Sequence, residues 1–139
     1  MKRKLLIVIP TTVMALLLLF GLAWWHSPVT LLRGVNPADV ARIEVSSGST
    51  GKSFCIEDAD TIARIVSNIQ AAKLHREEWE QIDGFSYSLS FYKADGTRVD
   101  AFILNGDDEI RKGDMTLECE SELLCFELLR ELEKSAAQY

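Results

Sequence analysis

The chain has 139 residues, and residues 5–25 form one run of 21 without a charged side chain. The 113 residues after His26 are enough for one small domain and too few for two. All 21 acidic residues lie in that part, against 12 of the 15 Lys and Arg, so its net charge is −9. This acidity argues against binding to nucleic acid or to an anionic lipid surface, and the recurrent apolar positions exclude a disordered chain.

The N-terminal run has the length and composition of a membrane-spanning helix. At about 1.5 Å per residue it would span roughly 31 Å, the thickness of the hydrocarbon core of a bilayer. Residues 16–20 form its apolar centre, and Trp24 and Trp25 follow where aromatic side chains gather at the membrane interface. The sequence therefore predicts a transmembrane helix over residues 5–25, with the lipid bilayer as its partner.

The distribution of charge around this run predicts its orientation. Residues 2–4 are all basic, whereas only Arg33 follows within the next 15 residues. By the positive-inside rule, residues 1–4 form a cytoplasmic basic tail and the rest of the chain lies outside. A cleaved signal peptide is the alternative, giving a secreted protein, because Gly21 and Ala23 are small residues at the −3 and −1 positions. The length of the run and Trp24 as a first mature residue favour an uncleaved signal anchor.

A stalk and one α+β domain are predicted to follow. Residues 26–36 contain Pro28 and Gly34 and few charges, which is typical of a stalk, and residues 37–139 form the domain. Residues 41–45 and 52–56 alternate with period two on either side of a polar turn, which indicates a hairpin. The next segment predicts a helix, capped by Asp58 or Asp60, whose buried stripe is Ile62, Ile65, Val66 and Ile69.

The second half of the domain predicts further strands and a final helix. Residues 74–84 are expected to form a charged loop. Residues 86–92 and 98–104 predict a hairpin around Asp95-Gly96, followed by short strands at 109–112 and 115–119. A last helix, capped by Ser121, would turn five side chains inward: Leu124, Cys125, Leu128, Leu129 and Leu132. The expected order is ββαβββα, with an antiparallel sheet and both helices on one face.

One segment approaches the pattern of a phosphate-binding P-loop. Residues 46–53 read Ser-Ser-Gly-Ser-Thr-Gly-Lys-Ser, but Ser46 stands where the first Gly of the motif belongs. Residues 54–56 then alternate as a strand, where the helix that holds the phosphates must begin. We interpret the segment as a hairpin turn and expect no nucleotide to bind.

The remaining candidates for chemistry are a calcium site, a zinc site and a catalytic serine. Four acidic residues around two turns could supply oxygen ligands for Ca²⁺, although the EF-hand spacing is absent: Asp107, Asp108, Glu109 and Asp114. His26 and His75 have no close Cys or His partner that would suggest zinc, and no Gly-x-Ser-x-Gly motif is present. We therefore expect no catalytic residue, no cofactor and no metal.

Three cysteines, Cys55, Cys119 and Cys125, would permit one disulfide in an oxidising compartment. Cys119 ends a strand and Cys125 lies in the first turns of the last helix, so these two could meet. Because Cys55 and Cys125 fall on faces assigned to the core, free buried thiols are favoured.

The candidate contacts with a partner are Trp79 and Tyr92. Trp79 lies in the acidic stretch 77–80, and tryptophan is favoured at the energetic centres of interfaces. Packing over the edge of the core explains Trp79 at least as well. The exposed strand face of Ser86, Ser88, Ser90 and Tyr92 would complete the contact surface.

Several stretches carry a resemblance to a known group of proteins. These are residues 37–45, Ile56-Glu57-Asp58 before the helix, and Tyr92–Gly96 leading to Ile103 and Asn105-Gly106. Over residues 36–134 the chain resembles small uncharacterised bacterial domains tethered outside the membrane, often as lipoproteins. Since this chain has no cysteine near the end of its apolar run, the resemblance implies anchoring by the helix. It implies no reaction and no functional residues.

The leading hypothesis is thus a single-pass membrane protein. Its outer domain would bind another component of the cell envelope without catalysis. The alternatives are an extracytoplasmic enzyme or calcium-dependent domain that uses the acidic loop, and a cytoplasmic nucleotide binder of reversed topology.

Overall fold

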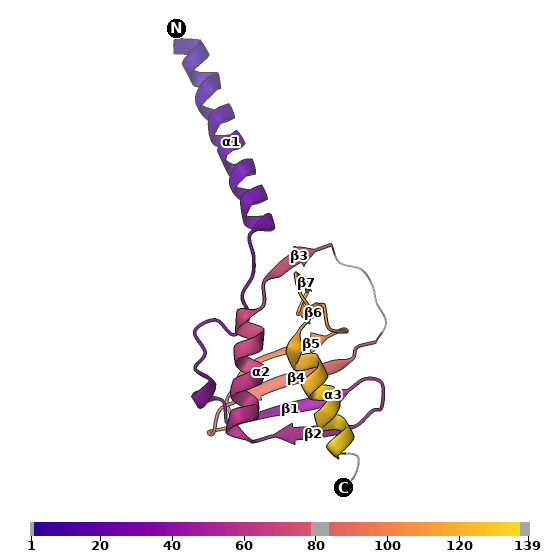
Figure 1. Ribbon diagram of the computed structural model, residues 1–139. Coiled ribbons are helices and arrows are strands. Elements are labelled where there is room, and N and C mark those ends of the chain that lie inside the picture. The colour runs from indigo at the N-terminus through magenta and orange to yellow at the C-terminus, as the bar shows by residue number, and fades with distance from the viewer. Residues whose placement is uncertain (1, 79–83, 137–139) are drawn as a thin grey trace.

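A computed structural model describes residues 2–78 and 84–136 of the chain, which form a long N-terminal helix and an α+β domain (Figure 1). Helix α1 (Lys2–His26) projects away from the domain and is long and apolar enough to cross a membrane. The large apolar side chains of residues 16–20 are exposed. The hydroxyls of Thr11 and Thr12 donate to the carbonyls of Ile7 and Val8 at 2.9 and 2.7 Å, so the helix itself satisfies these polar groups.

Within residues 27–78 and 84–136 the domain contains seven strands, two α-helices and a short 3-10 turn, η1 (Pro37–Asp39), capped by the side chain of Asn36. In chain order the other elements are β1 (Arg42–Ser47), β2 (Ser53–Ile56), α2 (Ala59–Ala71), β3 (Leu74–Glu77), β4 (Tyr87–Tyr92), β5 (Arg98–Leu104), β6 (Glu109–Lys112), β7 (Met115–Cys119) and α3 (Leu124–Ala136).

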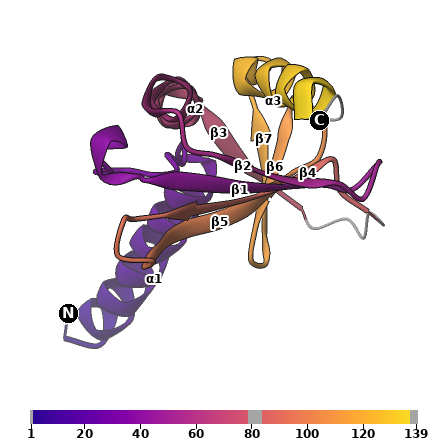
Figure 2. The ribbon, with the colours of Figure 1, turned by 90° about the horizontal axis from the view of Figure 1, so that it is seen from below.

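All seven strands form one antiparallel sheet, in the order β2-β1-β4-β5-β6-β7-β3. Figure 2 shows α2 and α3 on the same side of this sheet. Alternate side chains of β1 and β4, among them Ile43, Val45, Leu89 and Phe91, are fully buried beneath the helices. The expected α+β class, the antiparallel sheet and the common face of the helices are confirmed.

The order of elements differs from the expected ββαβββα. Residues 74–77, expected as part of a loop, form the edge strand β3, whereas the short strands predicted at 109–112 and 115–119 are present as β6 and β7, so that five strands and not three lie between α2 and α3 in the described chain. An edge strand needs few apolar residues and tolerates charges. In β3, Leu74 alone is fully buried, whereas His75 and Arg76 are half-buried and Glu77 is exposed. The charges that suggested a loop are therefore compatible with a strand at this place.

The helices bury the stripes that the sequence predicts, with one exception. The carboxylate of Asp58 caps α2 by accepting a hydrogen bond from the backbone N–H of Thr61 at 2.8 Å. Its four predicted apolar residues are all buried: Ile62, Ile65, Val66 and Ile69. In α3, Cys125 and Leu129 are buried, but Leu124 is 77% exposed, which corrects its predicted inward position. The helix begins only at Leu124, and the preceding Leu123 fills the core instead.

Residues 26–36 do not form the free stalk that their composition suggests. Leu31 and Leu32 are buried in the domain core. The backbone N–H of Val29 donates to the carbonyl of Leu74 at 2.7 Å, and the side chain of Gln70 donates to the carbonyl of Leu32 at 2.8 Å. The correction has a simple cause: the stretch has few charges because part of it packs against the domain.

The three thiols are free, and one of them is placed differently from the expectation. Cys125 is buried as predicted, but Cys55 is exposed, because its pairing with Glu44 puts it on the face of the sheet that the helices leave open. Burial raises the pKa of Cys119 to about 11 and that of Cys125 to about 12, so both stay protonated at neutral pH.

The three thiols should therefore differ sharply in reactivity. We expect the folded chain to take up one maleimide, at Cys55, and the denatured chain to take up three, as counted by intact mass. Cys55→Ser should reduce labelling of the folded chain to none. Rapid modification of Cys119 or Cys125 in the folded chain would contradict the packing of α3 described here.

Candidate binding groove

Of the two predicted contact residues, the structure describes Tyr92. Trp79 lies outside the residues that the structure describes. Tyr92 lies on the open face of the sheet, where the Arg42 guanidinium is 4.3 Å from its ring centroid and also pairs with Glu44. Ser88 and Ser90 are half-buried on the same face of the sheet.

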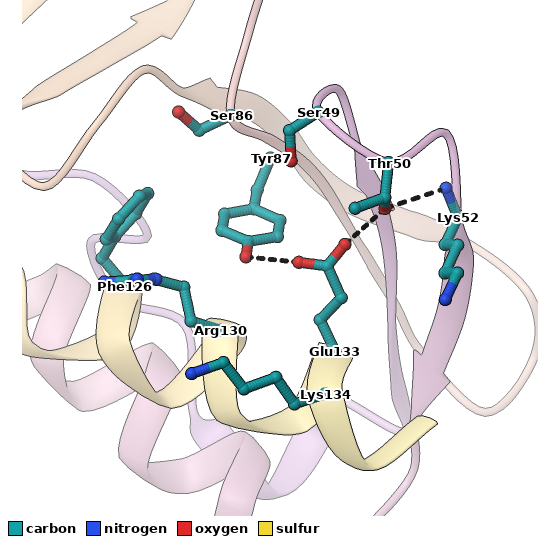
Figure 3. A pocket seen from close by; sticks show the side chains of 9 residues that line it. All are labelled: Ser49, Thr50, Lys52, Ser86, Tyr87, Phe126, Arg130, Glu133 and Lys134. Atoms are coloured by element: carbon teal, nitrogen blue, oxygen red, sulfur yellow. Dashed lines mark hydrogen bonds between the residues drawn. The ribbon is translucent and has the colours of Figure 1, made fainter. Parts of the chain in front are cut away.

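A groove of about 350 Å³ lies between α3 and the turn that joins β1 to β2 (Figure 3). Its lining combines hydroxyls, cations, one carboxylate and two aromatic rings: Ser49, Thr50, Lys52, Ser86, Tyr87, Phe126, Arg130, Glu133 and Lys134. The residues come from three separate parts of the chain. In α3 they follow the spacing of one helix face, since Phe126, Arg130 and Glu133 are four and three positions apart.

Glu133 is the centre of the polar network in this groove. The Tyr87 hydroxyl donates to its Oε2 at 2.7 Å, and the Thr50 hydroxyl donates to its Oε1. Figure 3 shows the carboxylate pointing between these two hydroxyls. Thr50 Oγ1 in turn accepts from the backbone N–H of Lys52 at 3.3 Å. The network therefore joins α3 to β4 and to the β1–β2 turn.

The protonation states of the network are fixed at neutral pH. Hydrogen bonds from Thr50 and Tyr87 lower the pKa of Glu133 below its usual 4.5. Burial, followed by the hydrogen bond to Glu133, raises the pKa of Tyr87 well above its usual value of 10. Glu133 thus stays ionised and Tyr87 stays protonated, so the pair holds a geometry and is poorly suited to exchange protons.

Three cations surround the single carboxylate of the groove. Arg130 is paired with Glu127 at 2.7 Å. For Lys52 and Lys134 no ion pair is found within the part of the chain that the structure describes. Although residues 27–139 have a net charge of −9, three cations and one carboxylate line this groove.

Close backbone packing holds the wall of the groove in place. The N–H of Gly48 donates to the carbonyl of Ser86 at 2.9 Å, which brings the β1–β2 turn against the residues that enter β4. The ring of Tyr87 packs edge-on against Phe126, with ring centroids 5.5 Å apart. These contacts join the β1–β2 turn to Ser86 and α3 to Tyr87.

The sequence does not predict the groove, although it singles out one of the segments that line it. Residues 46–53 approach the P-loop pattern, and β2 follows them as a strand paired with β1, as the hairpin interpretation predicts. Its Ser49, Thr50 and Lys52 nevertheless line the groove. The available signal was the recurrence of Phe126, Arg130 and Glu133 on one helix face, but it indicates no particular partner strand.

The acidic loop does not gather its carboxylates. Asp107 and Asp108 lie before β6 and Asp114 lies after it, so a four-residue strand of about 13 Å separates them. Glu109 is already paired with Arg111 at 3.1 Å. Among the described residues no group of three or more His, Cys, Asp or Glu side chains could hold a metal ion. This geometry gives no support to the calcium alternative.

Loss of the Glu133 charge should weaken the domain in a pH-dependent manner. Because the pKa of Glu133 is lowered, the ionised carboxylate stabilises the fold above about pH 4.5, and this contribution disappears as the pH falls through the lowered pKa. Glu133→Gln should cost about 1 kcal/mol of unfolding free energy at pH 7 and progressively less below pH 4.5, measured by urea unfolding. Glu131→Gln, on the exposed face of the same helix, is the control. An equal loss at all pH values would show that the network does not depend on the charge.

Comparisons with protein-family models, with curated proteins and with solved structures find no match for this chain. The resemblance to tethered bacterial domains is therefore not accompanied by a family assignment, and the function has to be argued from the groove and the N-terminal helix.

Proposed function

We propose that this protein is a single-pass membrane protein whose domain lies outside the cytoplasm and binds another component of the cell envelope without catalysis. The groove around Glu133 carries the proposal. It is the place where the domain combines a cavity, a fixed polar network and two lysines for which no ion pair is found in the described residues.

The membrane part of the proposal rests on α1 and the charges around it. The helix is exposed along its length, as a helix surrounded by lipid would be. The basic residues 2–4 precede it and only Arg33 follows within 15 residues, which supports an N-terminus in the cytoplasm and the domain outside.

The binding part rests on the chemistry of the groove. Lys52 and Lys134 can attract an anionic group, Ser49 and Thr50 can exchange hydrogen bonds with it, and Phe126 offers an apolar edge. A carboxylate held by two hydroxyls is suited to orienting a donor on the ligand. We therefore infer that the bound component presents an anionic group beside hydrogen-bond donors.

The absence of catalysis is proposed for a chemical reason. A general acid or base needs a pKa near the working pH. The pKa of Glu133 is lowered and that of Tyr87 is raised, so both move further from neutral pH. Ser49 has Ser47 as its hydroxyl partner at 3.1 Å, and that group cannot act as a base.

The test is photo-crosslinking in intact cells with a photoreactive residue in place of Ser49. The control carries the same residue at Lys93, which is exposed in the β4–β5 turn at the far end of β4 from Tyr87. We expect an adduct of defined mass from position 49 and none from position 93. The charge reversals Lys52→Glu and Lys134→Glu together should abolish it, whereas Lys93→Glu should leave it unchanged.

A third position tests the alternative surface. An adduct from Tyr92 without one from Ser49 would move binding to the open face of the sheet. The same adduct from positions 49 and 93, or one that survives the double charge reversal, would overturn the assignment of the groove.

A further inference from the structure

Arg76 on β3 holds the end of the membrane helix. Its Nη1 donates to the carbonyl of Trp24 at 2.8 Å and to that of Ser27 at 3.2 Å. Its guanidinium also lies over the indole ring of Trp24, 4.1 Å from the ring centroid. One side chain of the domain thus makes three contacts with the last turn of α1 and the residue that follows it.

These contacts suit the chemistry of a helix end. The last four carbonyls of an α-helix have no partner within the helix, and a cation near them is favoured by the helix dipole. Ser27 also donates to the Trp24 carbonyl through its hydroxyl at 2.6 Å. An arginine fits this place better than a lysine, because its planar group can bond two carbonyls and stack on a ring at once.

The chain beyond α1 is attached to the domain at several further points. Val29 forms an isolated antiparallel bridge with Leu74, the residue that begins β3. Leu31 and Leu32 are buried, and Gln70 of α2 donates to the carbonyl of Val35 at 2.7 Å. The connection between α1 and the domain is therefore fixed over most of its length.

We propose that the domain docks on the outer surface of the bilayer, with β3 at the level of the lipid headgroups and β2 farthest from them. This inference rests on the proposed function, since it requires that α1 spans the membrane. Trp24 ends the apolar run and lies at the depth of the interface. Because Arg76 contacts its carbonyl, β3 lies at the same depth, and Figure 1 shows β2 at the end of the domain opposite α1.

The docked arrangement predicts that position 78 lies closer to the lipid headgroups than position 55 does. The test uses the full chain in phosphatidylcholine vesicles that contain a nitroxide-headgroup lipid in both leaflets. A fluorophore is attached either to the native Cys55 of β2 or to Glu78→Cys, directly after β3, in a Cys55→Ser background. We expect quenching several-fold stronger at position 78 than at position 55. Arg76→Ala should bring the two values together, and Arg64→Ala, on the exposed surface of α2, should leave the difference unchanged.

Separate measurements identify the source of a failure. Equal quenching at the two positions in the otherwise unaltered chain would overturn docking, since a freely tethered domain averages over orientations. Release of the unaltered chain by alkaline carbonate would instead reject the membrane helix on which the inference rests. The unreactive Cys119 and Cys125 report whether Arg76→Ala still folds. Gln70→Ala, which removes another contact with the segment between α1 and the domain, should also reduce the difference in quenching between positions 78 and 55.

Discussion

Replacing Gly48 by alanine is expected to destabilise the domain by about 3 kcal/mol, at the upper end of the usual cost of overpacking. A Cβ at this position would penetrate the carbonyl oxygen of Phe85 and lie 3.0 Å from its carbonyl carbon. Both contacts are with backbone, so no side-chain rotation relieves them. The β1–β2 turn would have to separate from Ser86, which opens the wall of the groove. Urea unfolding of the full chain in detergent measures the loss.

Gly51→Ala provides the matched control in the same turn. Gly51 has a φ of +69° and open space around it, so the added methyl costs only the left-handed conformation, about 1 kcal/mol. Equal losses for Gly48→Ala and Gly51→Ala would contradict the close packing of the turn against Phe85 and Ser86.

Two arginines in the centre of α1 are expected to abolish its insertion into the membrane. Leu16 and Leu19 are exposed at the middle of the apolar run, and each Leu→Arg change at a helix centre costs about 3 kcal/mol of insertion free energy. The double variant Leu16→Arg, Leu19→Arg should no longer be found in the carbonate-resistant membrane fraction. Leu16→Ile with Leu19→Ile keeps the apolar character and should remain in it. Unchanged fractionation of the arginine variant would show that α1 does not anchor the chain.

The sequence predicted the parts of the fold that depend on local periodicity. The stripe of α2 and the alternation of β4 are visible because an apolar side chain recurs on one face whatever the partner is. The hairpin interpretation of residues 46–53 also follows from local pattern, and β2 is indeed paired with β1. The antiparallel class follows in turn from the short connections between strands.

The features that the sequence predicted wrongly depend on contacts with residues distant in the chain. The register between β1 and β2 places Cys55 opposite Glu44 on the open face, and the alternation of residues 52–56 does not specify which face is covered. Likewise β3 forms because its backbone pairs with the edge of β7, and Leu31 is buried because it packs into the core of the domain. The charges of residues 74–77 suggested a loop, and the proline in residues 26–36 suggested a stalk.

The groove could not be derived from the sequence for the same reason. Glu133 and Thr50 are 83 positions apart, and the hydrogen bond between them requires α3 to lie over the β1–β2 turn. The sequence points to Trp79 and Tyr92 because they are large aromatic residues in a charged loop and on an exposed strand face. Tyr92 lies on the open face of the sheet, as the alternation predicts, whereas Tyr87 of the groove lies on the opposite face, because an odd number of positions separates the two residues on one strand.

Labelling of the native Cys55 shows on which side of the membrane the domain lies. Intact cells that lack an outer membrane, or spheroplasts, are treated with a membrane-impermeant maleimide, and the intact mass of the protein is measured. We expect the carbonate-resistant chain to carry one label before lysis, lost in Cys55→Ser. Labelling of Cys55 only after lysis would place the domain in the cytoplasm and contradict the account.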